Sequence, residues 1–253
     1  MSNTLALGVK PIGSVTSYEK DKFPTYLKAK TRGIKLLGIH YQPNLERILL
    51  LKPDLIVGWD RERAIYPLLS TIAPTILGKW QGFPSWREYF NFIAKALGKK
   101  EAAQQAWNHY YQRIKELQIS LGEGYQNKKI SFIYFCCHGI GSDVKNSFIG
   151  SILNDAGLQR PEAQDVITFP YGTMNVSEEE LDKADGDILF VAAFTEDDKS
   201  YLKKLEQKPL WKKLKAVQQN HVYFVNGDAW RGGNLIAANF VIDDLFKYLV
   251  NTP

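Results

Sequence analysis

The sequence contains few cysteines and no long hydrophobic run. Its 253 residues include only two cysteines, Cys136 and Cys137, which are adjacent. Neighbouring residues of a strand point to opposite faces, so a disulfide between them would be strained, and we expect two buried thiols. The cysteines do not have a zinc-binding spacing. The longest apolar run, residues 130–137, is interrupted by Ser131 and is too short to span a bilayer.

Catalytic and export motifs are also missing. The four histidines are scattered, and the sequence has no Gly-x-Ser-x-Gly elbow, Walker sequence or His-Glu-x-x-His helix. Gly139-Ile140-Gly141 alone lacks the dinucleotide fingerprint, and nothing in the sequence ties Asp60 to His138 as a hydrolytic pair. We therefore predict that the protein is not an enzyme. The first residues show no basic region, apolar region or cleavage site of a signal peptide.

The net charge of +5 is unevenly distributed along the chain. Residues 1–98 hold 14 Lys and Arg against 7 Asp and Glu, whereas the remaining residues hold 18 against 20. This excess fits a solvated basic face, attraction of an anionic ligand, or contact with a membrane surface. No nucleic-acid-binding motif accompanies it, so we expect no nucleic-acid partner. One polar stretch carries a cluster of basic residues: Lys20, Lys22, Lys28, Lys30, Arg32 and Lys35.

Residues 42–60 carry the strongest local pattern. Asn44 is placed to cap a short helix, Glu46 lies in its first turn, and Pro53 follows its end. The apolar residues 55–57 predict a strand covered on both faces, as in a parallel sheet flanked by helices. Ligands of such sheets bind at the carboxyl ends of strands, which is where Trp59 and its neighbours fall.

Strands and helices alternate along the whole chain, which predicts an α/β fold with mainly parallel sheets. The periodic, uninterrupted segment 99–121 predicts a long helix that either joins two lobes or lies across one large domain. We expect an N-terminal lobe (1–98), a connecting helix (99–124) and a C-terminal lobe (125–253). The predicted strands are residues 12–15, 34–37, 55–57, 75–77, 129–137, 187–193 and 221–225. The predicted helices are residues 66–72, 86–97 (capped by Ser85 and stopped by Gly98), 148–156, a short helix opening at 176–177, a helical stretch from 202, and 235–250.

Several motifs resemble one known family. They are Pro43-Asn44-Leu45-Glu46, then Leu51-Lys52-Pro53-Asp54-Leu55-Ile56 ending at Gly58, then Ser177-Glu178-Glu179-Glu180-Leu181, and Pro209-Leu210-Trp211. Together they resemble the class III substrate-binding proteins of ABC importers, which capture ferric siderophores, haem or cobalamin outside the cytoplasmic membrane. The resemblance covers nearly the whole chain and implies two lobes with a ligand cleft between them. Members usually carry a signal sequence, then a first strand and helix, before the segment that matches here. We expect this chain to lack that first strand, and we expect an upstream in-frame extension with a signal peptide.

The resemblance also implies a ligand site. Trp59 and Tyr171 fall where members place ligand-facing aromatic residues, and Trp230 matches a tryptophan of ferric hydroxamate binders. His40, beside Tyr41, stands where ferric-citrate-like relatives carry arginine, which leaves the charge of the ligand open. The cation can come from Arg61, Arg63 or Arg231, through charge-assisted hydrogen bonds to the chelate. Each of these residues also fits an ordinary packing role, and we interpret Trp80, Phe83 and Trp86 as core residues.

Glu46 and Glu179 occupy the positions at which members dock onto arginines of the membrane permease. A capping role at a helix N-terminus is the alternative for both, and the two roles are compatible. We therefore expect a monomeric, extracytoplasmic binding protein with a ferric siderophore as ligand, an ABC permease as partner, and no covalent cofactor or protein-bound metal. Cobalamin or haem binding, and a non-transport sensor or scavenger, remain the alternatives.

Overall fold

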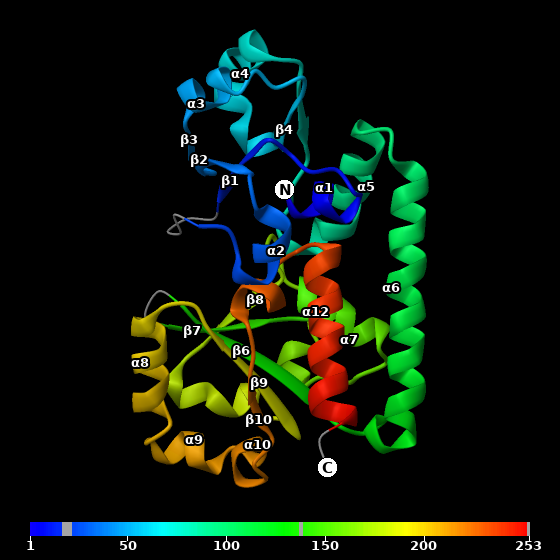
Figure 1. The fold of residues 1–253 in the computed structure, drawn as a ribbon. Coiled ribbons are helices and arrows are strands. Elements are labelled where there is room, and N and C mark those ends of the chain that lie inside the picture. The colour runs from blue at the N-terminus through cyan, green and yellow to red at the C-terminus, as the bar shows by residue number, and fades with distance from the viewer. Residues whose placement is uncertain (17–21, 137–138, 252–253) are drawn as a thin grey trace. The chain divides into compact units, whose positions relative to one another are not determined.

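We describe the fold from a computed structural model, which covers the chain except residues 17–21, 137–138 and 252–253 (Figure 1). The chain forms two compact units. The first comprises residues 1–81, 85–108 and 234–236, and the second comprises residues 82–84, 109–233 and 237–253. The expected α/β class with mainly parallel strand pairs is confirmed. The predicted boundaries after residues 98 and 124 stay a prediction.

The first unit contains two small sheets. One has the order β1-β2-β3 and the other pairs β4 with β5 in parallel, in a register that runs from Ile56 opposite Thr75 to Trp59 opposite Gly78. Its elements are α1 (Ser2–Ala6), β1 (Gly13–Thr16), η1 (Thr25–Leu27), α2 (Lys28–Thr31), β2 (Lys35–Ile39), β3 (Gln42–Pro43), α3 (Leu45–Leu50), β4 (Ile56–Trp59), η2 (Asp60–Ile65), α4 (Tyr66–Ile72), β5 (Thr75–Gly78), η3 (Phe83–Ser85), shared with the second unit, and α5 (Trp86–Ala96).

Two details of this unit differ from the sequence-based expectation. Strand β4 is half-buried along its length rather than covered on both faces, because in the described chain it pairs only with β5. Ser85 does not cap α5, since its hydroxyl oxygen accepts a hydrogen bond from the backbone N–H of Gln81 at 2.9 Å instead. The predicted cap of α3 is confirmed, because the Asn44 side chain accepts from the backbone N–H of Arg47 at 2.8 Å.

The second unit is built on one sheet of five strands in the order β10-β9-β6-β7-β8. The elements are α6 (Lys100–Leu121), whose first residues belong to the first unit, η4 (Gly122–Tyr125), β6 (Ile130–Cys136), β7 (Gly139–Asp143), α7 (Phe148–Asp155), η5 (Glu162–Gln164), β8 (Thr173–Val176), η6 (Glu178–Ala184), β9 (Ile188–Ala193), α8 (Glu196–Leu205), α9 (Pro209–Lys213), α10 (Lys215–Gln218), β10 (Val222–Phe224), α11 (Gly227–Trp230), α12 (Leu235–Leu245), which begins in the first unit, and η7 (Phe246–Val250), a π-helical turn.

Strands β7 and β8 were not predicted. They extend the parallel β10-β9-β6 group by two antiparallel pairings, β6 with β7 and β7 with β8. Residues 139–143 alternate glycine with other residues, a pattern that gives a weak strand signal in the sequence. Helix α8 begins six residues before the predicted position, because the Thr195 hydroxyl accepts from the backbone N–H of Asp198 at 3.1 Å and starts the helix there.

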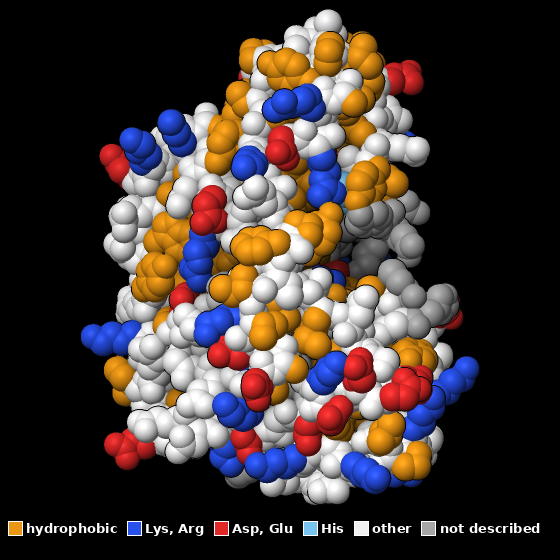
Figure 2. Space-filling model, turned by 180° about the vertical axis from the view of Figure 1, so that it is seen from behind, with side chains coloured by type: hydrophobic (Ala, Val, Ile, Leu, Met, Phe, Trp, Pro, Cys, Tyr) orange, Lys and Arg blue, Asp and Glu red, His pale blue; other side chains and the backbone are white. Residues whose placement is uncertain are grey.

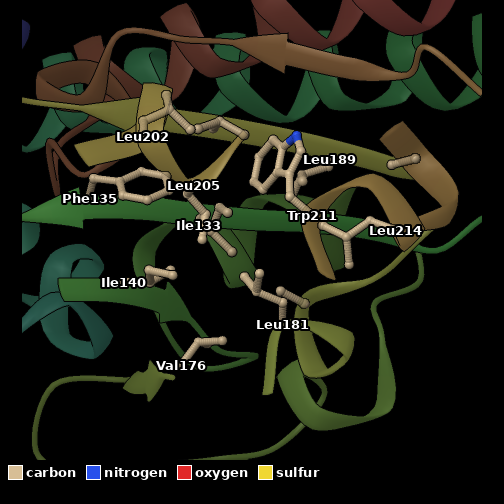
Figure 3. Packing of buried hydrophobic residues seen from close by; sticks show 13 residues of the cluster. Ile133, Phe135, Ile140, Val176, Leu181, Leu189, Leu202, Leu205, Trp211 and Leu214 are labelled. Atoms are coloured by element: carbon tan, nitrogen blue, oxygen red, sulfur yellow. The ribbon is translucent and has the colours of Figure 1, made fainter. Parts of the chain in front are cut away.

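Both faces of the central strands β6 and β9 are buried, as expected for parallel strands flanked by helices. On one face, Ile133 and Leu189 of the central strands pack with Leu202, Leu205 and Trp211 of the following helices (Figure 3). The intervening strand positions carry aromatic rings such as Phe132 and Phe190, which are also fully buried. The sheet therefore forms the middle layer of the second unit, and its strand ends position the loops that follow them.

Two further sets of expectations concern the cysteines and the residues that the structure does not describe. Cys136 is half-buried rather than buried. Cys137, His138 and Lys20 lie outside the described residues. Across the described ranges, no helix combines the length and the apolar character that a membrane crossing requires.

Candidate functional site

An aromatic cluster lies at the carboxyl ends of three strands of the first unit. His40 and Tyr41 follow β2, Trp59 ends β4, and Trp80 follows β5. The indole rings of Trp59 and Trp80 stack, with centroids 5.3 Å apart and an interplanar angle of 8°. The imidazole of His40 meets the edge of Trp59 at 5.5 Å. Sequence reasoning placed three of these four residues in a ligand site, and the fold brings those three together.

Tyr89 of helix α5 also packs against this group. Its hydroxyl donates a hydrogen bond to the backbone oxygen of Gly58 at 3.1 Å, and its ring meets the edge of Trp80 at 5.5 Å. The sequence did not single out Tyr89, and it suggested core packing for Trp80. Trp80 could have been recognised as a site residue, because it lies in the loop after a parallel strand, and the loop that begins at Trp59 has the same position. Trp86, in contrast, is a core residue as predicted.

Arg61 supplies the cation of this cluster. Its guanidinium carbon lies 5.5 Å from the ring centroid of Trp59 and 5.8 Å from that of Tyr41. One terminal nitrogen donates to the Tyr41 hydroxyl at 3.2 Å. The loop that carries Trp59 and Arg61 is fixed at its start, where the backbone N–H of Trp59 donates to the Glu62 carboxylate at 2.6 Å. We call His40, Tyr41, Trp59, Arg61, Trp80 and Tyr89 the first-unit cluster.

His40 contributes an aromatic ring to this cluster rather than a charge. Its side chain is buried, and its ring centroid lies 3.9 Å from that of Tyr41. Burial lowers the pKa of His40, and the nearby positive charge of Arg61 adds to this effect, although a hydrogen bond to the backbone of Thr16 opposes it. A lowered pKa keeps the imidazole neutral at neutral pH. Arg61, and not His40, is therefore the positively charged member of the cluster.

In the second unit, the predicted aromatic residue Tyr171 is accessible. It lies in the loop between η5 and β8, and 54% of its surface is exposed. Phe169 of the same loop is 81% exposed. Exposed aromatic rings on a loop at the end of a sheet are available for packing against an apolar ligand.

The prediction that Trp230 faces the ligand is wrong. Its side chain is fully buried, and its ring centroid lies 4.5 Å from that of Phe190 and 5.2 Å from that of Phe132. The indole N–H donates to the Asp244 carboxylate at 2.7 Å. Helix α11 turns Trp230 toward the sheet, so the residue stabilises the core of the second unit.

Arg231, the next residue, lies at the border of this core. Its guanidinium carbon is 3.8 Å from the ring centroid of Tyr134 and 5.0 Å from that of Phe83. Its Nε–H donates to the carboxylate of Asp143 at 3.2 Å. Burial lowers the pKa of Arg231, but the charge and hydrogen bond of Asp143, together with the nearby Tyr134 and Cys136, raise it above its usual value. Arg231 is thus a permanently charged group with a side chain that is 18% exposed.

Asp143 and Arg160 were not identified from the sequence. Both side chains are buried, and Arg160 donates to the backbone oxygen of Asp143 at 2.7 Å and to the side-chain oxygen of Gln164. Burial lowers the pKa of Arg160 to about 10, although the Asp143 charge opposes this effect. Asp143 ends β7, a strand that the sequence pattern did not predict, so no local signal marked it.

The two predicted docking glutamates are exposed and do not cap their helices. Asn44 itself caps α3, and Glu46 at the second helical position has no bonding partner among the described residues. In the Glu178-Glu179-Glu180 run, Glu178 is bonded to Tyr201 and Lys208, and Glu180 is bonded to Lys183. Glu179 alone of the three has no such bond within the described chain. Neither carboxylate makes a capping hydrogen bond within the described chain, but both lie in the first turn of a helix, where the helix dipole favours a negative charge.

The described residues contain no group of three or more His, Cys, Asp or Glu side chains placed to hold a metal ion.

Comparisons with known proteins agree with this architecture. Residues 6–229 match the model of the periplasmic binding protein family. The probable siderophore-binding lipoprotein YfiY of Bacillus subtilis is 32% identical over 98% of this chain and 79% of its own length. The achromobactin-binding periplasmic protein of Dickeya dadantii is 29% identical over 96% of this chain and 81% of its own length. The structure of Staphylococcus aureus SirA complexed with staphyloferrin B is similar at a TM-score of 0.82, with 28% identity, and covers 98% of this chain and 88% of that one.

The motifs, the paired α/β units and these comparisons lead to one assignment: this chain belongs to the periplasmic binding protein family.

Proposed function

We propose that this protein is the solute-binding component of an ABC importer that captures a ferric siderophore outside the cytoplasmic membrane. The observation that supports this most directly is the first-unit cluster, where Arg61 lies against the rings of Trp59 and Tyr41 at the carboxyl ends of parallel strands. The printed names of YfiY and the achromobactin-binding protein describe siderophore binding, and that of SirA names staphyloferrin B as its ligand. A ferric siderophore is a bulky, partly apolar chelate, so its body packs on aromatic faces.

In this proposal the candidate ligand contacts are Tyr41, Trp59 and Arg61 in the first unit and, considered separately, Tyr171 and Arg231 in the second unit. The rings contribute apolar area, and the arginines bind chelate oxygens through charge-assisted hydrogen bonds. His40 supports Trp59 and Tyr41 as a neutral ring. The chelator supplies the ligands of the iron, so binding requires no protein-bound metal and no catalytic step.

Titration with a ligand panel, followed by intrinsic tryptophan fluorescence, tests this function. The panel contains ferric citrate, a ferric hydroxamate, a ferric catecholate, cobalamin and haem, with each iron-free chelator as control. A ferric siderophore should quench strongly through the stacked pair of Trp59 and Trp80. Tyr171→Ala should weaken binding, whereas Tyr111→Ala, which removes a ring that is 51% exposed on α6, should not. Strong binding of cobalamin or haem with no response to any ferric siderophore would contradict the proposal.

We further propose that Glu46 and Glu179 dock onto the permease. Glu46 shares one face of α3 with Leu49 and Leu50, which follow it at the helical spacing of three and four residues. These leucines are 57% and 72% exposed. Hydrophobic side chains gather over the region of α3 and α4 on the face of the first unit that Figure 2 shows. Apolar side chains surrounded by charged ones are typical of protein–protein interfaces.

Charge reversal tests the docking role. Glu46→Arg combined with Glu179→Arg should abolish uptake of the labelled ferric ligand while leaving its affinity for the isolated protein unchanged. The matched control reverses Glu88 and Glu162, which are also exposed acids in the first turn of a helix, and it should transport normally. Normal uptake by the Glu46 and Glu179 double variant would remove this assignment.

The proposal also includes the location of the protein in the cell and its oligomeric state. The names of YfiY and the achromobactin-binding protein describe a lipoprotein and a periplasmic protein, which supports a place outside the cytoplasmic membrane. We propose that the protein acts there as a monomer. Protease accessibility in intact cells that express the gene with its own upstream region, and light scattering of the purified protein, test these two statements.

A further inference from the structure

The second unit contains a guanidinium group, that of Arg231, which is held by one charged hydrogen bond and one cation–π contact. Of the hydrogen-bonding groups of Arg231, the Nε–H is used by the Asp143 carboxylate at 3.2 Å. The ring centroid of Tyr134 lies 3.8 Å from the guanidinium carbon, which is a short distance for a cation–π contact. Tyr134 belongs to β6, which lies beside β7 (Figure 1). Together these contacts restrict where the guanidinium group lies and which way its Nε–H points.

The two contacts are built by one pair of neighbouring strands. Asp143 ends β7, and Tyr134 on β6 lies opposite Gly141 of β7 in the antiparallel register. The Tyr134 ring lies over Gly141 so closely that a Cβ atom at this glycine would be 2.2 Å from the ring. Because Gly141 leaves this space, the ring can lie flat on β7 and reach Arg231. The glycine-containing segment 139–141, which the sequence did not explain, therefore has a role in shaping this site.

Asp143 is better suited to orienting Arg231 than to stabilising the unit. Its side chain is fully buried, and its second carboxylate oxygen, Oδ1, has no hydrogen-bond partner among the described residues. A buried ion pair with an unsatisfied oxygen gains little over an apolar pair of similar size, so stability alone is a weak explanation for it. The arrangement does fix the orientation of one cation.

The terminal nitrogens of Arg231 remain available. Within the described part of the chain, neither Nη1 nor Nη2 donates a hydrogen bond, and the side chain is 18% exposed to solvent. Two parallel N–H groups of a guanidinium match the two oxygens of a carboxylate in a bidentate pair. Lysine carries the same charge but cannot present this planar pair of donors.

We propose that Asp143 is a positioning residue, which together with Tyr134 orients Arg231 so that its terminal nitrogens bind a carboxylate of the ligand. This inference rests on the proposed siderophore-binding function and narrows it to ferric chelates that carry a carboxylate. Asp143 acts through Arg231 and does not itself touch the ligand.

The test compares two chelates and four proteins. Ferric citrate carries carboxylates, whereas ferrioxamine B is a tris-hydroxamate without one. Their affinities are measured by tryptophan quenching for the wild type, Arg231→Lys, Asp143→Asn and Lys145→Gln. The last variant removes a nearby cation that pairs with Asp165 on the surface, and so shows whether loss of any local positive charge weakens binding. Melting curves by circular dichroism identify any variant that fails to fold.

Wild type should bind ferric citrate more tightly than ferrioxamine B. Arg231→Lys and Asp143→Asn should each weaken ferric citrate binding by about 10- to 100-fold, the usual effect of losing a charged hydrogen bond. Any binding of ferrioxamine B should be unchanged in all variants, and Lys145→Gln should behave as the wild type. A merely structural role of Asp143 would instead weaken both chelates together and lower the melting temperature.

Three outcomes would overturn the inference: a wild type that prefers ferrioxamine B, an Asp143→Asn variant that folds and binds ferric citrate normally, or equal losses for the two chelates. If Asp143→Asn does not fold, Tyr134→Leu takes its place, because it removes the other contact that orients Arg231 and should likewise weaken ferric citrate binding alone. If the wild type binds no ferric chelate of the wider panel, the proposed function itself fails. If it binds them without the expected dependence on Arg231, only the carboxylate inference fails.

Discussion

Two tryptophans followed by arginines show how differently similar local sequences are used. Trp59 is half-buried and stacks on Trp80, with Arg61 against it. Trp230 precedes Arg231 directly, yet it is fully buried and donates its indole N–H to Asp244. The difference arises because Trp59 ends a strand and enters a loop, whereas helix α11 directs Trp230 into the core. Of Trp230 and Arg231, therefore, only Arg231 remains partly accessible.

We predict that Trp230→Phe destabilises the protein and leaves ligand binding unchanged. The substitution leaves the half-buried Asp244 carboxylate without its donor, at a cost of about 1–3 kcal/mol in the free energy of unfolding. Urea unfolding measures this loss, and fluorescence titration measures affinity. Trp59→Phe is the counterpart, with the opposite expectation: lower affinity and little change in stability. Weaker ligand binding by Trp230→Phe at unchanged stability would return this residue to the ligand site.

We also expect His40 to make stability depend on pH. Burial lowers its pKa in the folded protein below the unfolded value of about 6.5, so at mildly acidic pH the unfolded state binds more protons. The free energy of unfolding should therefore fall as pH decreases through this value. His40→Phe keeps a ring in the cluster but removes the titration, so urea unfolding between pH 7.5 and 5.5 should show a smaller slope. Equal slopes in the two proteins would contradict this assignment.

At the scale of elements, the central strand pair of the second unit depends on a glycine. Tyr134 of β6 and Gly141 of β7 are opposite residues, and the tyrosine ring fills the space that a side chain would need. Cross-strand aromatic–glycine pairs of this kind let a ring cover the neighbouring strand. Here the covering ring also contacts Arg231.

Gly141→Ala should therefore displace the Tyr134 ring. A Cβ at this position would lie 2.2 Å from the ring, so we expect an overpacking cost of about 1–3 kcal/mol and a weaker hold on Arg231. Gly139→Ala on the same strand is the matched control, because its nearest neighbour would be a backbone oxygen at 3.8 Å. Thermal unfolding and ferric citrate titration of both variants measure the two effects. Indistinguishable behaviour of the two alanine variants would show that the ring tolerates the added methyl group.

At the scale of the whole molecule, the formal net charge of +5 is the relevant property. Basic residues predominate in residues 1–98, whereas charges of both signs are interspersed over the lower part of the surface in Figure 2, which corresponds to the second unit. A positive field attracts anions from a distance and accelerates their association, and salt screens this effect.

We predict that the association rate of an anionic ferric chelate falls steeply with ionic strength, while its dissociation rate changes little. Stopped-flow fluorescence at a series of salt concentrations measures both rates. Ferrioxamine B, which carries a positive charge, should show no such decrease. A rate for ferric citrate that is independent of salt would exclude electrostatic steering by this protein.

The sequence by itself determined the local elements, the α/β class and part of the site. The bounds of α4, the long helix α6 and the cap at Asn44 follow from apolar periodicity and capping, which depend on residues a few positions apart. The carboxyl ends of the predicted strands correctly marked Tyr41, Trp59 and Arg61 as neighbours.

Only the tertiary structure decided the burial of Trp230, the antiparallel strands β7 and β8, and the pairing of Asp143 with Arg231. That pair joins residues 88 positions apart. Its partners meet because the sheet places the end of β7 beside the turn after α11, and no local pattern encodes that proximity. Burial likewise depends on which face of an element the rest of the fold covers, so a tryptophan of the core, such as Trp230, and one of the first-unit cluster, such as Trp59, look the same in the sequence.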